Sequence, residues 1–516
     1  MSATRPLLPA YDYLVLGAGS GGCVVARRLV ERTSAKVLLI EAGATSFGVE
    51  GIEDPTRWVP LAKTPWDWGY DYTPTERVHG RTIPIPRGRA LGGSSATNAM
   101  MWYRGAPIDY DLWGASGADG WSFEACLPYF KRAEDWQDGA SEFRGAGGPL
   151  RIARSPDLHP IAQALIDAAV EIGIPRLDDP NGASNEGAAP SNFNIVGGRR
   201  WSSAEGYLKP VLGVQGLTVL TDSLAVELMM EGGHCVGVRH LVDGVVRETR
   251  ATTGVVLALG AIDTPRLLVL SGIGDPEELK RLGVAVKVAL PGVGRNFQDH
   301  PLLRAVNARA KWPLGAPRDN GGGSMVNWRS LPGLPFADVH AFPVQGRSAV
   351  PRVLERYDLS GDLFSIGTGL MRSTSVGHVR MLEAKLLGAL DIQPNFLAEP
   401  RDLSALVRAL EQVMDMLETR AFADWFDGFA APDRRLTKTD AVEFVRDSCS
   451  TFFHCAGTAK MGTDALAVCD PRLNVHGVEG LSIADASVIP ILPSCNTHAP
   501  VTMIAERAAD FLTGAA

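Results

Sequence analysis

Two of the ten histidines stand in segments whose neighbours could support proton transfer. His454 lies in an apolar run, Thr451-Phe-Phe-His-Cys-Ala-Gly, that closes in glycine. His498 lies two residues before Pro500, and proline suits the first turn of a helix. The free N–H groups of that helix start would stabilise a developing anion, and an imidazole beside them could accept a proton from an alcohol. By residue type alone, a histidine is more often structural than catalytic.

A glycine-rich turn near the beginning of the chain predicts a dinucleotide site. Gly17, Gly19 and Gly22 fit G-x-G-x-x-G between the apolar run 13–16 and a predicted helix. Such glycines allow a tight turn, close approach of backbone to a pyrophosphate, and packing of helix on strand. Glu41 follows the next apolar strand at the distance expected for a carboxylate that binds ribose hydroxyls. An acidic residue there favours FAD or NAD over NADP, and these residues do not choose between the first two.

Other segments predict the elements that position these residues. Short apolar runs at 254–260 and 481–484 predict further strands of the nucleotide-binding sheet. Residues 216–226 alternate like a strand, and Asp243-Gly244 predicts the turn of a hairpin over 237–252. Helices are predicted at 159–172 and 402–419, and another helix is predicted to contain Pro265 at its start.

The segment around residues 86–105 contains Gly92-Gly93 followed by Ser94 and Ser95. These glycines permit close backbone approach, and the hydroxyls can donate to phosphate. The alternative is an ordinary helix with a glycine entry and a serine cap.

The totals exclude some classes of function. A net charge of −8 and a pI near 5.8 give no general attraction to nucleic acid or to anionic membrane. No run approaches the length of a membrane span. Residues 1–10 lead directly into the first strand, so we expect no signal peptide and a cytoplasmic location. The seven cysteines contain no CxxC pair, so we expect reduced thiols and no metal site.

The separated motifs together resemble the glucose–methanol–choline (GMC) family of FAD-dependent oxidoreductases over essentially the whole chain. The resemblance rests on the turn at residues 17–22 with Glu41, and on segments 89–98, 260–274, 292–300, 451–462 and 496–500, in that order. It implies an α/β, Rossmann-type FAD-binding domain combined with an α+β substrate domain that contains a second sheet. The FAD-binding domain would comprise residues 1–155, 216–300 and 466–516, and the substrate domain residues 156–215 and 301–465.

The resemblance also implies which residues hold FAD. They are Gly17, Gly19, Ser20, Gly22, Glu41, Ala42, Trp68, Leu91, Gly93, Ser94, Asn98, Ala99, Met100, Met101, Val226, Asp485, Ala486, Thr497, His498 and Pro500. Some members attach FAD covalently through a histidine just before the asparagine of the Gly-Gly segment. That position is Thr97 here, so non-covalent FAD is implied.

For catalysis, the resemblance implies that His454 takes the hydroxyl proton while hydride moves to flavin N5. His498 matches a position that is histidine or asparagine among members, and it would orient the alcohol. His300 belongs to a family motif and is interpreted as structural. Phe452, Phe453, Trp66 and Trp102 are candidate linings of the substrate site and favour an aromatic or apolar alcohol.

The function implied is oxidation of a primary alcohol to an aldehyde, with oxygen as the electron acceptor. A dehydrogenase that uses a quinone or another acceptor is the first alternative. A hydroxynitrile lyase on the same scaffold is an alternative of another class, and a photo-driven decarboxylase and a nicotinamide dehydrogenase are further ones. A flavin-binding module without activity is disfavoured because both catalytic positions carry histidine.

Overall fold

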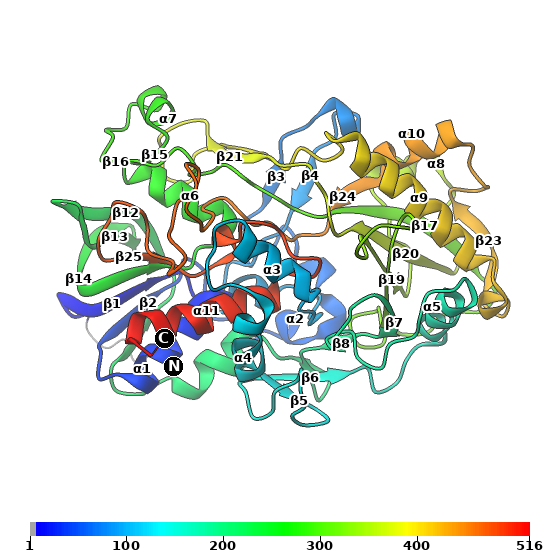
Figure 1. Ribbon diagram of the computed structural model, residues 1–516, viewed down its shortest axis with the longest axis horizontal. Coiled ribbons are helices and arrows are strands. Elements are labelled where there is room, and N and C mark those ends of the chain that lie inside the picture. Colours follow the sequence, from blue (N-terminus) through cyan, green and yellow to red (C-terminus); the bar gives the residue numbers. More distant parts are fainter. Residues whose placement is uncertain (1–6, 516) are drawn as a thin grey trace.

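Two seven-stranded sheets lie next to each other along the longest axis of the molecule (Figure 1). The computed structural model describes residues 7–515, apart from the side chain of residue 305. Residues 1–6, on which the expected absence of a signal peptide depends, lie outside that range. Among the described residues, no helix has the length and apolar character needed to cross a membrane.

The first sheet is built around the apolar runs that predicted its strands. Its order is β11-β2-β1-β14-β13-β12, and β25 pairs with β14. The central pairs β2–β1, β1–β14 and β14–β25 are parallel, as in a dinucleotide-binding sheet. The strands are β1 (Ala10–Leu16), β2 (Val37–Ile40), β11 (Leu217–Leu220), β12 (Ser223–Glu231), β13 (His234–Val242), β14 (Val245–Leu257) and β25 (Leu481–Ile483).

The predicted hairpin at Asp243-Gly244 is confirmed, because β13 and β14 pair antiparallel across these two residues. Both have positive φ, 51° and 75°, as a tight hairpin turn requires. The single strand predicted over 216–226 is wrong: Asp222, with φ 54°, separates β11 from β12.

Three helices lie near the glycine turn: α1 (Ser20–Arg32), α6 (Gly260–Leu270) and α11 (His498–Thr513). Helix α1 packs on β1 and β2, α6 packs on β12, and α11 packs on α1. The helix predicted after the turn is confirmed by α1. The prediction that Pro265 stands at a helix start is wrong, since α6 begins at Gly260 and contains Pro265 in its interior. Proline cannot donate to the carbonyl four residues earlier, Ala261. The hydroxyl of Thr458 donates to that carbonyl instead, at 2.6 Å.

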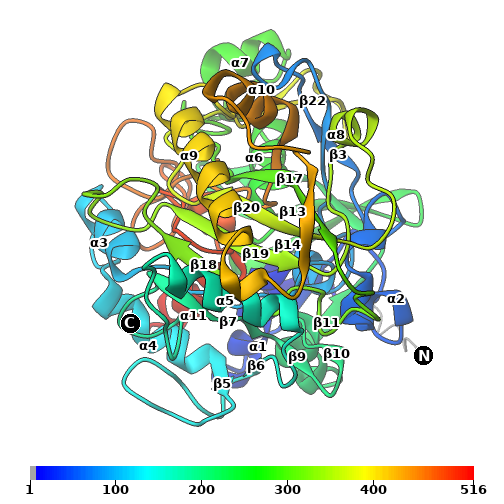
Figure 2. The ribbon, with the colours of Figure 1, turned by 90° about the vertical axis from the view of Figure 1, so that its right-hand side faces the viewer.

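The second sheet is antiparallel, with the order β23-β17-β20-β19-β18-β7 and with β24 paired to β17. Figure 2 shows α9 (Pro400–Leu417) and α5 (Pro160–Glu171) over one face of it, and both confirm predicted helices. The strands are β7 (Gly187–Pro190), β17 (Pro301–Ala310), β18 (Ser324–Trp328), β19 (Val339–Val344), β20 (Leu363–Leu370), β23 (Phe426–Ala431) and β24 (Cys449–Thr451).

The remaining elements are short and mostly connect or cover the sheets. The helices are α2 (Glu50–Glu53), α3 (Pro107–Ala115), α4 (Phe123–Ala133), α7 (Pro276–Arg281), α8 (Pro351–Arg356) and α10 (Lys438–Ser448). The strands are β3 (Tyr70–Tyr72), β4 (Ile83–Ile85), β5 (Glu134–Trp136), β6 (Leu150–Arg154), β8 (Asn192–Phe193), β9 (Ile195–Val196), β10 (Arg199–Arg200), β15 (Ile273–Gly274), β16 (Val288–Ala289), β21 (His378–Met381) and β22 (Leu390–Gln393).

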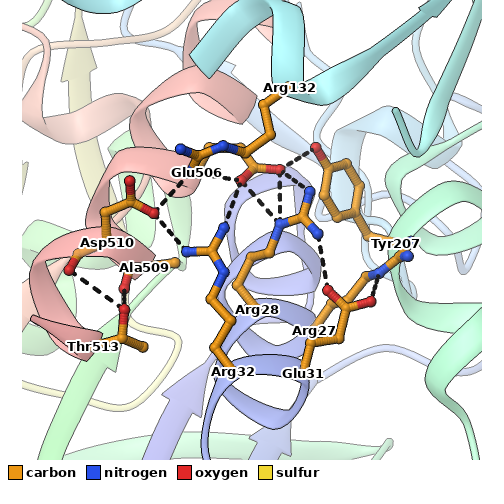
Figure 3. A network of polar contacts seen from close by, with 10 residues as sticks. All are labelled: Arg27, Arg28, Glu31, Arg32, Arg132, Tyr207, Glu506, Ala509, Asp510 and Thr513. Carbon is orange, nitrogen blue, oxygen red and sulfur yellow. Dashed lines mark hydrogen bonds and ion pairs between the residues drawn. The ribbon is translucent and has the colours of Figure 1, made fainter. Parts of the chain in front are cut away.

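A buried ionic network joins α11 to α1 (Figure 3). Glu506 of α11 is 0% exposed, and it accepts hydrogen bonds from Arg28 of α1 at 2.7 Å and from the hydroxyl of Tyr207 at 2.8 Å. One turn further along α11, Asp510 accepts from Arg32 at 2.5 Å and from Arg132 at 2.7 Å. These contacts hold the helix whose first residue is His498 against the helix that follows the glycine turn.

Candidate functional site

A cavity of about 570 Å³ runs from the glycine turn of the first sheet to the second sheet. Its wall includes Gly17 and Gly19 at one end, and Phe342 and Val344 of β19 at the other. His454 and His498, which are 44 residues apart in the sequence, both lie on this wall. The cavity therefore joins the predicted nucleotide site to both predicted catalytic residues.

Most of the residues predicted to hold FAD lie on this wall, and four do not. Those on the wall are Gly17, Gly19, Ser20, Glu41, Ala42, Trp68, Gly93, Ser94, Asn98, Ala99, Met100, Met101, Asp485, Ala486, Thr497 and His498. Gly22, Leu91, Val226 and Pro500 are absent from it, and Ser223, Leu224 and Ala225 line the cavity just before Val226.

The structure requires glycine at position 22 of the turn but not at position 19. A Cβ at Gly22 would lie 1.8 Å from the carbonyl oxygen of Gly17, so packing of helix on turn requires glycine there. At Gly19 the nearest protein atom to such a Cβ is 3.7 Å away and φ is −73°, so the fold itself does not require glycine. Gly19 caps α1 without a side-chain hydrogen bond, which leaves N–H groups of the first turn free for a phosphate. This cradle fits a pyrophosphate.

Glu41, which the sequence predicts to bind a ribose, lines the cavity. The carboxylate is 6% exposed, and its oxygens accept the N–H groups of Ala18 and Gly43, each at 2.8 Å. A carboxylate offers about four acceptor sites, so it can still accept from ribose hydroxyls. Burial raises the pKa of Glu41 to about 7, and the two N–H groups and Arg89 oppose that rise.

The Gly-Gly segment forms only a short 3₁₀ turn, Gly93–Ala96, so the alternative of an ordinary helix there is wrong. A Cβ on Gly93 would lie 2.7 Å from the Cα of Gly19, which means the two glycine segments touch. The side-chain oxygen of Asn98 accepts the N–H of Met100 and a guanidinium N–H of Arg200, both at 2.9 Å. These bonds hold residues 98–101 along the cavity, where a flat ring would lie.

His454 is positioned by the pairing of β17 with β24. In that ladder Pro301 lies opposite Thr451, so the residues flanking the two strands converge. One carboxylate oxygen of Asp299 accepts the backbone N–H of His454 at 2.7 Å and that of His300 at 2.8 Å. Phe452 stacks on the His454 ring at 4.5 Å between centroids.

The two imidazoles are hydrogen-bonded to each other. Nδ1 of His300 lies 2.8 Å from Nδ1 of His454, with the rings nearly perpendicular. Burial, and next the neighbouring His300, hold the pKa of His454 well below its usual value. Burial also lowers the pKa of His300 to about 3. Both rings are therefore neutral near pH 7, and Nε2 of His454 is the ring nitrogen left for a molecule in the cavity.

His498 begins α11 and packs edge-on against Trp102, at 5.4 Å between ring centroids. Its Nε2 lies 3.0 Å from the hydroxyl of Ser203, and its Nδ1 has no hydrogen-bond partner among the described residues. Burial, with a smaller contribution from Arg200, lowers the pKa of His498 to about 4. Thr497 caps the helix without a side-chain bond, so free N–H groups also face this part of the cavity.

The aromatic lining is only partly the predicted one. Phe452 and Phe453 lie on the wall, whereas Trp66 and Trp102 do not. Trp66 packs on a small cluster with Leu61, and Trp102 is fully buried. Phe342, which the sequence reasoning missed, lies parallel to Phe452 at 5.4 Å. A Cβ at Gly367 of β20 would meet the Phe342 ring at 2.5 Å, so glycine lets this ring lie flat on the sheet.

Arg87, Arg304, Asn320 and Arg347 are further wall residues that the sequence reasoning missed. No local sequence pattern marked these four residues, because their places on the wall depend on which distant segments the fold brings together. Cys455 also lies on the wall, and burial raises the pKa of its thiol to about 11. In the described part of the chain all seven cysteines are free, and no cluster of His, Cys, Asp or Glu could hold a metal ion.

Comparison with known proteins gives consistent matches. Family models described as GMC oxidoreductase match residues 11–302 and 373–505. Human mitochondrial choline dehydrogenase is 36% identical over 98% of this chain and 90% of its own length. An oxygen-dependent choline dehydrogenase of Photobacterium profundum is 33% identical over 98% and 93%. The crystal structure of pyridoxine 4-oxidase from Mesorbium loti superposes with a TM-score of 0.92 at 32% identity, covering 96% of this chain and 98% of the other.

Proposed function

The chain belongs to the GMC oxidoreductase family of flavoproteins, and on that premise we propose that it oxidises a primary alcohol to the aldehyde with His454 as the base. The observation that carries the proposal is the His454–His300 contact on the wall of a cavity that also contains the nucleotide cradle. FAD held by the nucleotide cradle would supply the hydride acceptor for the carbinol carbon and the route by which the electrons leave.

The protein's own residues manage the proton. We assign the shared proton of the two imidazoles to Nδ1 of His454, which donates it to Nδ1 of His300. This tautomer leaves a lone pair on Nε2 of His454, which takes the hydroxyl proton of the substrate. His454 stays neutral until then, because burial disfavours an imidazolium in the resting cavity. His498 and the free N–H groups at the start of α11 orient the alcohol, and they stabilise negative charge that develops beside them during the reaction.

For the cofactor, we propose a tight but non-covalent complex. Thr97, and not a histidine, stands on the wall just before Asn98, and its hydroxyl is no partner for a flavin bond of that kind. Precipitation with acid should therefore release all of the flavin into the supernatant.

As electron acceptor we propose oxygen, with peroxide as the product. The names of one relative and one similar structure, an oxygen-dependent dehydrogenase and an oxidase, support this choice. The alternative is a quinone or another acceptor, as the name of the human relative suggests.

Anaerobic titration of the yellow protein with a panel of primary alcohols tests the proposal. Bleaching of the flavin by at least one alcohol, followed by recovery of colour and release of peroxide when air is admitted, is the expected result. Colour that returns only after addition of a quinone would favour the dehydrogenase. No bleaching by any alcohol would overturn the proposed oxidation and shift weight to a lyase.

A further inference from the structure

The charged residues on the wall of the cavity differ between its two ends. The end that contains the glycine turn has both signs of charge, since Lys63, Arg87 and Arg266 lie there together with carboxylates. Four carboxylates lie on the wall, and all of them belong to the part of the chain that builds the nucleotide end: Glu41, Asp67, Asp263 and Asp485. On the second sheet and its loops, the charged side chains on the wall are Arg304 and Arg347. The end that would hold the substrate is therefore positively charged.

The carboxylates are already engaged and do not neutralise these arginines. Asp263 pairs with Arg266 at 3.0 Å. Asp485 accepts the N–H of Gly260 at 2.9 Å and the hydroxyl of Thr264 at 2.6 Å. Asp67 accepts two backbone N–H groups, each at 2.8 Å. Each of these bonds lies within the nucleotide end of the cavity.

Arg304 is a partly buried guanidinium without a counter-ion. It lies where the register of β17 against β20 is irregular, between Leu303 and Val306, and both Arg304 and Leu302 line the wall. It forms no hydrogen bond or ion pair with another described residue. Burial lowers its pKa, and no carboxylate offsets the effect. An uncompensated charge in such a place is costly unless a ligand supplies the opposite charge.

Arg347 lies at the rim of the same end. It is exposed, follows β19, and has no ion-pair partner among the described residues. The next residue, Ser348, is fixed to β17: its N–H donates to the side chain of Asn307 at 3.0 Å, and its carbonyl accepts from it at 3.1 Å. Asn307 is three residues beyond Arg304 on that strand, so the two arginines lie on neighbouring parts of the wall.

We propose that the substrate is an alcohol that carries an oxyanion, a carboxylate or a phosphate, and that Arg304 binds this group with help from Arg347. The proposal rests on the proposed function and names its substrate class. Arg304 is four positions beyond His300, roughly 13 Å along an extended chain, so the oxyanion and the hydroxyl would be at opposite ends of an elongated molecule. A quaternary ammonium such as choline, the substrate in the relatives' names, would meet like charge here.

The test compares three alcohols on the FAD-loaded enzyme by anaerobic stopped-flow reduction: 4-(hydroxymethyl)benzoate, neutral benzyl alcohol, and choline. We expect the second-order rate constant of flavin reduction to be higher for the carboxylate than for benzyl alcohol by a ratio of about tenfold or more, as a charged hydrogen-bonded contact allows. Arg304→Gln should bring the ratio close to one, and Arg304→Lys should restore part of it. Arg309→Gln is the matched control, because Arg309 lies on the same strand but pairs with Asp358 outside the cavity, and it should leave the ratio unchanged.

Equal rates with the anionic and neutral alcohols, faster reduction by choline, or an unchanged ratio in Arg304→Gln would overturn the proposal. 4-(Hydroxymethyl)phenyl phosphate in the same assay separates a phosphate from a carboxylate preference. Binding of benzoate, followed by its perturbation of the flavin spectrum, separates this proposal from the proposed function. If no alcohol reduces the flavin, the proposed oxidation is wrong. Benzoate binding that is lost in Arg304→Gln would then still support the anion site, whereas benzoate binding that survives in Arg304→Gln would refute the anion site.

Discussion

The Nδ1 atoms of His454 and His300 lie 2.8 Å apart, so one imidazole fixes the tautomer of the other. Asp299 holds the backbone N–H groups of both residues on one oxygen atom, which fixes the distance between their segments. Because only one of the two Nδ1 atoms can carry the shared proton, the state of His300 decides whether His454 presents a lone pair or an N–H to the cavity. The sequence interpretation of His300 is structural, and from this contact we propose that His300 also positions the proposed base.

Replacing His300 by phenylalanine should slow flavin reduction without weakening substrate binding. The ring shape is kept but the acceptor for His454 Nδ1–H is lost, so the imidazole can rotate or change tautomer. We expect the limiting reduction rate to fall on the order of 10²-fold, as for loss of a general base, with an unchanged substrate Kd. Anaerobic stopped-flow measurements give both values.

His300→Gln provides the conservative comparison, because its amide oxygen can still accept from Nδ1–H. It should restore part of the rate. His159→Asn is the matched control, since His159 is a buried histidine that caps α5 away from the cavity. A His300→Phe enzyme that reduces flavin at the parent rate would show that His300 has no part in positioning the base.

The pH profile should show an acidic limb below the ordinary range of histidine. The pKa of His454 is held well below 6.5 by burial and by His300, so the base stays neutral as the pH falls through 6.5. We expect kcat/KM for flavin reduction to be flat between pH 8 and 6 and to decline only in more acidic solution. A decline centred at pH 6.5 to 7 would show that the base is a solvated imidazole.

The lowered pKa values of buried histidines should also make the stability of the fold sensitive to acid. Burial lowers the pKa of His340 to about 3 and that of His498 to about 4, whereas the unfolded chain titrates near 6.5. Between these values the unfolded state binds more protons, so stability falls as the pH drops below about 6.5, by up to about 1.4 kcal/mol per pH unit for each such ring. Thermal unfolding at pH 8, 6.5 and 5 measures this. His340→Gln, which removes one such group, should lessen the loss between pH 6.5 and 5, and an equal loss would refute the assignment.

Two glycines of the same motif should separate cofactor binding from folding. Gly19→Ala places a methyl group where no protein atom is closer than 3.7 Å. The free energy of unfolding of the FAD-free protein should therefore change by no more than about 0.5 kcal/mol. Because this methyl group would occupy space in the cavity that bound FAD needs, the affinity for FAD should fall at least tenfold. Gly22→Ala instead forces a carbon to 1.8 Å from the Gly17 carbonyl and should destabilise the protein by about 1–3 kcal/mol even without FAD. Flavin content and thermal unfolding measure both. Unaltered FAD affinity in Gly19→Ala would contradict the assigned cradle.

The first sheet could be predicted from the sequence because its signals are local. The glycine turn, α1, and the hairpin at Asp243-Gly244 each depend on residues close in sequence, and each was confirmed. Failures arose where a distant residue decides the outcome. Pro265 lies inside α6 because Thr458, almost 200 residues away, supplies the missing hydrogen bond.

In the candidate site, too, local features could be predicted from the sequence, and features that depend on distant residues could not. Sequence motifs identified the two histidines and most of the predicted FAD-binding residues that lie on the wall of the cavity. The partners of these residues depend on strand register, which the motifs do not give. His300 reaches His454 only because Pro301 pairs with Thr451, and Arg304 reaches the cavity from an irregularity in the register of β17 against β20. Trp102 was expected on the wall, but it is fully buried, with its edge against His498. No local pattern distinguishes these outcomes.

Glu506→Gln should destabilise the enzyme strongly, because Glu506 compensates several arginines in the network of Figure 3. The carboxylate is fully buried and pairs with Arg28 at 2.7 Å, with Arg132 at 3.7 Å and with Arg32 at 3.8 Å. Although burial opposes the charge on Arg28, the contacts with Glu506 raise its pKa above the usual value. Glutamine keeps the shape but not the charge, so at least one guanidinium is left uncompensated. Breaking a buried pair in this way costs about 3–5 kcal/mol.

The matched control is Arg176→Gln, which breaks the exposed pair with Asp167 and should cost less than about 1 kcal/mol. Thermal unfolding of the FAD-loaded enzymes measures both effects. Since α11 carries both Glu506 and His498, the surviving Glu506→Gln protein should also reduce its flavin more slowly, because the helix that presents His498 is held less firmly. Equal unfolding temperatures for the two variants would show that the network does not stabilise the junction of α1 and α11. A lower unfolding temperature with an unchanged reduction rate would show that it stabilises the fold without positioning His498.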